Sequence, residues 1–80
     1  MWLSIINVEA TNDYKLILTF ENSEKRCLDM SQFFGFGSFV ELKDINEFKK
    51  VRVSFDTIEW ENGLDLEPEF LYEKSVVMND

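Results

Sequence analysis

The stretch YKLILTF, from Tyr14 to Phe20, alternates between two sets of side chains. One face of an extended strand carries Tyr14, Leu16, Leu18 and Phe20, and the other carries Lys15, Ile17 and Thr19. This period of two is typical of a strand with one buried face, so the chain is expected to form a sheet that covers an apolar layer. Because the chain has only 80 residues, it is expected to be a single domain, residues 1–80.

The segments on either side of this strand predict an antiparallel meander. WLSIINVEA, residues 2–10, has strand-forming residues, and TND after it supplies a turn. ENS turns the chain again, and EKRCLDM can return as a third strand. The regular alternation then stops at SQFFGFGSFVELKD, where we expect a loop with a helical turn near residues 39–42.

The second half of the chain predicts a short helix and a second hairpin. Asp44 and Glu47 have the spacing of a capping box before a short helix, which would turn Ile45 and Phe48 inward. The next segment, VRVSF, places three apolar residues on one face, and IEW is expected to pair with it. The three residues are Val51, Val53 and Phe55.

Two turn signals close the chain. Asn62 and Gly63 predict a tight turn, and Pro68 predicts the first residue of a helix over PEFLYEKSVV. The expected fold class is therefore α+β. It comprises a mostly antiparallel, curved sheet of about five strands with a short middle helix and a C-terminal helix.

The charge balance restricts the partners. The chain has 16 acidic and 8 basic residues, a net charge of -8, and its basic residues are interleaved with acidic ones. Such a surface repels a phosphate backbone, so no direct nucleic-acid binding is expected. The N-terminus has no basic segment, and no apolar run approaches the roughly 20 residues of a membrane span. One cysteine fits a reducing compartment, and we expect a cytoplasmic protein without a membrane contact.

No catalytic or cofactor motif emerges from the residue types. The chain has no histidine, which removes the commonest general base, and Cys27 is interpreted as a structural cysteine. GFGS lacks the remaining residues of a dinucleotide or phosphate-binding loop. A non-enzymatic protein without a cofactor is the expectation.

An acidic run extends from Asp56 to Glu73 with seven acidic residues and no basic one. Calcium-loop spacing is missing, so a solvated acidic face is favoured over a metal site. Helix capping accounts for Asp65, Glu67 and Glu69. The remaining carboxylates are expected to face a basic partner, and they are Asp56, Glu59, Glu61 and Glu73.

The stretch FFGFGSF, Phe33 to Phe39, has two interpretations. Its rings can close the open side of the sheet, because the glycines allow tight turns. Alternatively, the stretch forms a contact surface. Rings that alternate around glycines cannot all point inward, so we expect Phe36 to stay partly exposed and to belong to the partner surface.

The order DYKLILTFENSEKRCLDMS, then FVELKDINEFKKVRVSFDTIEWENGLDLEPEFLY, resembles a bacterial family catalogued as domain of unknown function 2442. The resemblance covers about residues 5–73. The closing signature of the family matches at Ile58, Trp60, Asn62, Gly63, Asp65, Pro68, Leu71 and Tyr72. This chain departs from the family pattern at ENSE, where a turn glycine is replaced, and at Leu64, where the residue is often small.

The resemblance implies an α+β fold with a curved antiparallel sheet and no established enzymatic activity. Family genes, similar to antitoxin genes, often lie beside the gene for another very small protein. The signature residues have structural explanations: Asp65 can bond the free amides near the next helix, while Trp60 can pack with Leu71 and Tyr72.

Two functions remain open from the sequence. The first is a non-enzymatic module that binds a small, basic protein as an antitoxin does, with a homodimer as a further association to consider. The alternative is a small-ligand-binding domain with a pocket between the sheet and the helices.

Overall fold

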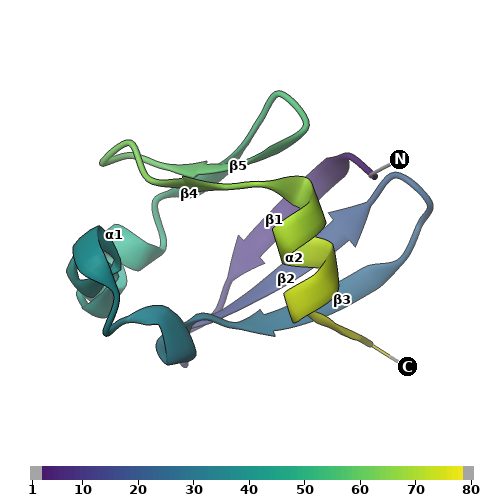
Figure 1. Cartoon of the computed structure of the whole chain (residues 1–80). Helices are drawn as coiled ribbons and strands as arrows, with labels where there is room; N and C mark the ends of the chain where they lie inside the picture. The colour runs from purple at the N-terminus through teal and green to yellow at the C-terminus, as the bar shows by residue number, and fades with distance from the viewer. Residues whose placement is uncertain (1–2, 79–80) are drawn as a thin grey trace.

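The computed structural model describes residues 3–78, which form two antiparallel sheets and several short helices around one core (Figure 1). Sheet A has the strand order β1-β2-β3-β7, and sheet B has the order β4-β5-β6. The strands are β1 (Ile5–Ala10), β2 (Lys15–Phe20), β3 (Lys25–Asp29), β4 (Val51–Ser54), β5 (Thr57–Trp60), β6 (Asp65–Leu66) and β7 (Val76–Val77). The helical elements are the 3-10 turns η1 (Met30–Phe33) and η2 (Gly37–Lys43), and the α-helices α1 (Ile45–Phe48) and α2 (Pro68–Lys74). The predicted α+β class, middle helix and C-terminal helix are confirmed.

The meander β1-β2-β3 has the predicted pairing and faces. Leu18 lies opposite Val8 on β1 and opposite Arg26 on β3, both antiparallel. Leu16, Leu18 and Phe20 are completely buried, as the alternation predicts. β2 is therefore the middle strand of the meander and supplies three side chains of the core.

The number of strands and sheets differs from the prediction. The sequence predicts one sheet of about five strands, whereas residues 3–78 contain seven strands in two sheets. Strands β6 and β7 have two residues each, too few to show any periodicity. The sheets adjoin where the Ile5 N–H donates to the Asp56 carbonyl at 3.0 Å. Next to this contact, the register of β1 shifts between Ile5 and Asn7, and a bulge of this kind interrupts a ladder.

The β4–β5 hairpin lies over one side of the β1–β3 sheet (Figure 1). Val51 and Val53 pack against the core as predicted, but the prediction for Phe55 is wrong. β4 ends at Ser54, so Phe55 and Asp56 form the turn, and the phenyl side chain is fully exposed. The alternation of Val51 and Val53 suggested that the strand continued to Phe55, but the strand ends one residue earlier.

The two α-helices start where the sequence predicts. The Asp44 carboxylate accepts a bond from the Asn46 N–H at 3.0 Å, which caps α1, while Glu47 pairs with Lys50. Phe48 of α1 is completely buried.

Helix α2 begins at Pro68 but lacks the expected side-chain cap. Its N-cap residue is Glu67, whose side chain makes no capping bond. Asp65, which was expected near the free amides, instead lies in β6 opposite Glu59. The prediction that the helix extends over PEFLYEKSVV is wrong at its C-terminal end: α2 ends at Lys74, and Val76 and Val77 pair with β3 as β7.

The core draws side chains from both sheets. It contains Ile5, Leu16, Leu18, Phe20, Leu28, Met30, Phe34, Leu42, Phe48, Ile58, Trp60 and Leu71. Phe34 is 6% exposed and Phe36 is 67% exposed, so the phenylalanine stretch both closes the core and presents a ring to solvent. Gly37 has a φ of +53°, the left-handed conformation that allows this sharp change of direction.

Candidate interaction surface

Most of the closing signature Ile58–Tyr72 holds the fold together. Trp60 is completely buried, and its indole N–H donates to the Phe48 carbonyl at 2.9 Å. Gly63 has a φ of +94° in the turn after β5, and Leu71 of α2 is buried in the same core. Because Trp60 shares a strand face with Ile58 and Trp2 stands at the start of the chain, the sequence predicts that Trp60 is buried and Trp2 less so. The burial of Trp60 is confirmed, and Trp2 lies outside the described residues.

Tyr72 attaches α2 to sheet A. Its ring packs edge-on against Phe20, with centroids 5.1 Å apart, and the Arg26 guanidinium lies 4.1 Å from the ring centroid. Arg26 also donates to the Ser75 hydroxyl and forms an ion pair with Glu24 at 2.9 Å. The polar groups of these side chains therefore bond to one another and not to a ligand. We call Glu24, Arg26 and Tyr72 the clamp, because they hold α2 against sheet A.

The clamp changes two pKa values. The Tyr72 hydroxyl donates to Glu24 at 2.8 Å, and this bond, with those from Asn22 and Arg26, lowers the pKa of the Glu24 carboxyl below 4.5. The same bond raises the pKa of Tyr72 above 10.0, because deprotonation would remove the donated proton beside a carboxylate.

The acidic run has cationic neighbours that the sequence did not reveal. Glu59 lies 3.7 Å from Arg52, and Glu61 lies 3.6 Å from Lys50. These pairs arise because β4 and β5 are adjacent antiparallel strands, with Arg52 opposite Glu59. Exposed pairs of this kind contribute little stability, but they weaken the local negative field.

The middle of the acidic run lies beside η2, the segment that follows Phe36. The Asn62 amide donates to the Glu41 carboxylate of η2 at 3.2 Å, so the turn after Glu61 lies beside the segment that follows Phe36. Val40 of η2 is also exposed. The structure therefore places the exposed Val40 and the Glu41 carboxylate in the segment beside the turn after Glu61, and Phe36 precedes this segment at the N-cap of η2.

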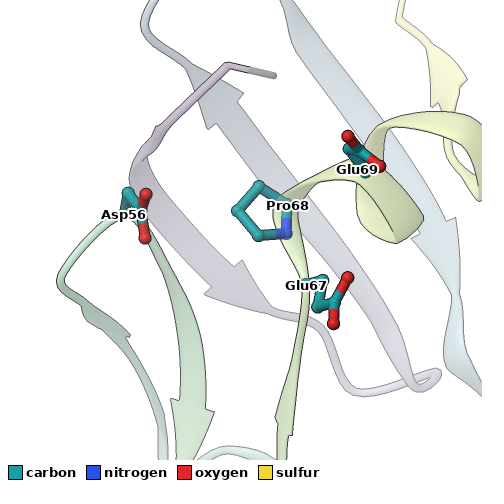
Figure 2. A pocket seen from close by; sticks show the side chains of 4 residues that line it. All are labelled: Asp56, Glu67, Pro68 and Glu69. Atoms are coloured by element: carbon teal, nitrogen blue, oxygen red, sulfur yellow. The ribbon is translucent and has the colours of Figure 1, made fainter. Parts of the chain in front are cut away.

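Asp56 belongs to the other end of the β4–β5 hairpin. Figure 1 places this hairpin's turn away from α1, on the side where the chain starts. Here a pocket of about 310 Å³ is lined by Asp56, Glu67, Pro68 and Glu69 (Figure 2). Asp56 faces Pro68 across the pocket, and the two glutamates flank the proline. The fourth predicted carboxylate, Glu73, lies on α2 and is exposed.

The exposure of Phe55 was not predicted from the sequence. This residue has an exposure of 101% and a φ of +57°, beside the pocket residue Asp56. A positive φ at the first residue of a two-residue hairpin loop is typical of glycine, and it is uncommon for a bulky side chain. The spacing between β4 and β5 indicates a loop of two residues, but phenylalanine is not a residue type that indicates a turn.

The metal-ligating side chains of residues 3–78 do not gather in one place. No group of three or more histidine, cysteine, aspartate or glutamate side chains there is arranged to hold a metal ion. Cys27 is partly buried on β3, opposite Ile17. None of the helices in the described part of the chain has the length and hydropathy of a membrane span.

Comparison with known proteins identifies the family. No curated protein and no solved structure matches the chain. The model of the family described as "Protein of unknown function (DUF2442)" matches residues 5–76, which include the closing signature and all strands and helices except Val77 of β7. This chain belongs to the DUF2442 family.

Proposed function

We infer that this protein is a non-enzymatic interaction module of the cytoplasm that binds a small, basic protein, as an antitoxin binds its toxin. The observation that carries this proposal is the 67% exposure of Phe36, in a stretch whose neighbouring ring, Phe34, is only 6% exposed. An exposed aromatic residue among polar neighbours is typical of a contact surface, because it loses water-exposed area when a partner covers it.

Charge supports a basic partner. The net charge is -8, and carboxylates accompany the exposed apolar residues at both ends of the β4–β5 hairpin. Opposite charges speed the encounter of two proteins and disfavour partners of like charge. A homodimer through the acidic surface is therefore less favoured than a complex with a cationic protein.

The proposal is tested by purifying the tagged protein from its native host and identifying co-purifying proteins by mass spectrometry. Phe36→Ser is the test variant, and Phe33→Ser is not a suitable control because Phe33 packs against the core. Val77→Ser on β7 is a better control, since it also removes an exposed apolar group. The proposal predicts a small, basic protein that is lost with Phe36→Ser and retained with Val77→Ser.

The antitoxin-like role has its own test. Candidate toxins, meaning any small proteins encoded beside this gene in the native host, are expressed one at a time from an inducible promoter, with and without the acidic protein. One of them is expected to arrest growth alone and to be neutralised by co-expression. If growth never depends on co-expression, the antitoxin-like role is contradicted. The purification experiment then remains the test of whether the protein binds a basic partner.

The pocket favours one alternative, a domain that binds a small cationic ligand. Its volume of about 310 Å³ is near the lower limit for ligand pockets, and three carboxylates line it. Spermidine and arginine amide are suitable probes. This alternative predicts a saturable rise in melting temperature that Glu69→Lys removes and that Glu9→Lys, with the same net charge, preserves.

A further inference from the structure

We propose that Phe55 is the aromatic anchor of the complex with the basic protein, and that cationic groups of this partner lie against the carboxylates beside it. This inference rests on the proposed function and adds a contact at the end of the hairpin remote from α1 (Figure 1). Three features carry it: the exposure of the ring, the conformation and support of the turn, and the charge around it.

The exposure of Phe55 has no role in the fold. The ring is as accessible as in an extended peptide, at 101%, and it is the most exposed of the large apolar side chains in residues 3–78. Ile6, which is 60% exposed, follows the residue whose N–H bonds to Asp56. A phenylalanine and an isoleucine therefore reach solvent from two segments that meet at the same point.

The conformation of Phe55 also runs against folding stability. At a φ of +57°, a side chain crowds its own backbone, and glycine would adopt this conformation more readily. Residues held in such conformations are concentrated at functional positions. A folding requirement alone would favour glycine or asparagine here, whereas a binding requirement explains a large ring.

The turn that carries Phe55 is held from both sides. Ser54 pairs with Thr57 across the hairpin, and the Asp56 carbonyl accepts the Ile5 N–H at 3.0 Å. The Thr57 hydroxyl donates to the Leu66 carbonyl of β6. A ring presented from a fixed turn loses little conformational entropy on binding, as rigid aromatic anchors do in other interfaces.

The charge around Phe55 selects the chemistry of the occupant. Asp56, Glu67 and Glu69 line the adjacent pocket, and within residues 3–78 no basic side chain forms an ion pair with either glutamate. Arginine and lysine side chains complement such a rim. A second copy of this chain would bring the same carboxylates face to face across a two-fold axis, so a basic protein with an apolar pocket is the favoured occupant.

The experiment places the photoreactive analogue p-benzoylphenylalanine at position 55, and separately at position 36, in the full chain expressed in its native host. Irradiation is expected to cross-link position 55 to one basic protein, at a site flanked by arginine or lysine. That protein is then purified and titrated with the unmodified chain and its variants. Cross-linking of position 55 to a second copy, to an acidic protein or to no protein would overturn the inference.

The titration separates binding from folding. Phe55→Ser is expected to weaken the complex by about 30-fold or more, as loss of an anchor residue does. Phe55→Gly is expected to weaken it equally while raising the melting temperature, because glycine adopts the positive φ without crowding. Glu69→Lys should weaken the complex more than Glu9→Lys on β1. Affinities of Phe55→Ser and Phe55→Gly within threefold of the unmodified chain would show that the ring is not an anchor.

The two positions also separate this inference from the proposed function. If position 36 cross-links to a basic protein and position 55 does not, the proposed function is supported and the anchor role of Phe55 is contradicted. If neither position captures a protein, both the module and the anchor are contradicted.

Discussion

Trp60 of β5 donates its indole N–H to the backbone carbonyl of Phe48, the last residue of α1, at a distance of 2.9 Å. Both side chains are completely buried, and their ring centroids are 6.3 Å apart. This contact joins sheet B to the short middle helix and fills the centre of the core.

Trp60→Ala is expected to unfold most of the protein at room temperature. Removal of a buried tryptophan costs about 3–5 kcal/mol, which is comparable to the total stability of so small a domain. Trp60→Phe keeps much of the volume and loses the N–H donor, so it should have an intermediate effect. Urea denaturation followed by circular dichroism measures both variants. A urea denaturation curve for Trp60→Ala that matches the curve of the unmodified chain would show that the core does not depend on this side chain.

Phe34 and Phe36 form a matched pair for the phenylalanine stretch. Phe34→Ser should destabilise the fold by about 2–4 kcal/mol, because this ring is 6% exposed and packs edge-on against Tyr14 at 5.1 Å. Phe36→Ser should change stability by less than about 0.5 kcal/mol, because its ring is in solvent. Thermal melting of the two variants tests this difference, and equal losses would contradict a division of roles between the two rings.

Gly63 and Gly35 provide a similar pair for the backbone. Gly63→Ala should cost about 1 kcal/mol or more, because the residue has a φ of +94°. Gly35 has no positive φ, and an added Cβ would meet no atom within 4 Å, so Gly35→Ala should be neutral or slightly stabilising. Chemical denaturation of both variants is the measurement. A neutral Gly63→Ala would show that the turn after β5 relaxes into another conformation.

The clamp of Glu24, Arg26 and Tyr72 should make stability depend on pH in the acidic range. Folding lowers the pKa of Glu24, so the stabilising contribution is complete above the unfolded value near 4.5 and is lost as pH falls through the folded-state value. Tyr72 has a raised pKa, so its contribution is present below 10.0 and is lost as pH rises through the higher folded-state value.

Tyr72→Phe is the variant that tests the clamp. It removes the hydroxyl that donates to Glu24 but keeps the ring beneath Arg26. We expect the pKa of Glu24 to rise toward 4.5 and the acid-dependent loss of stability to become smaller. Carboxyl pKa values from NMR titration measure the first effect, and urea denaturation at several acidic pH values measures the second. An unchanged pKa of Glu24 would show that the Tyr72 hydroxyl does not hydrogen-bond to this carboxylate.

Local patterns predicted most elements, but not how they assemble. The alternation of β2, the Asp44 cap and the Asn62–Gly63 turn each depend on neighbouring residues, so the sequence displays them. The arrangement of the two sheets involves the register shift in β1 and the hydrogen bond between Ile5 and Asp56, which are far apart in the sequence. Such long-range pairing has no local signature.

The surface was predictable in part for the same reason. The exposure of Phe36 followed from its place between two glycines, whereas the exposure of Phe55 depended on where β4 ends. The carboxylates of Glu59 and Glu61 were visible in the sequence, but their cationic neighbours were supplied by the preceding segment and strand. The prediction for Phe55 was wrong, and the negative charge expected at Glu59 and Glu61 was too large, because both depend on how β4 pairs with β5.

The central claim is that an acidic surface draws a basic protein to this chain. Its most direct test is the association rate constant, measured by stopped flow between about 50 and 500 mM salt, with the partner identified by purification. We expect the rate constant to fall steeply as salt rises, and to be lower at every salt concentration for the double variant Glu59→Lys and Glu61→Lys. A rate constant that is independent of salt and unchanged in the double variant would contradict the claim and favour the small-ligand pocket.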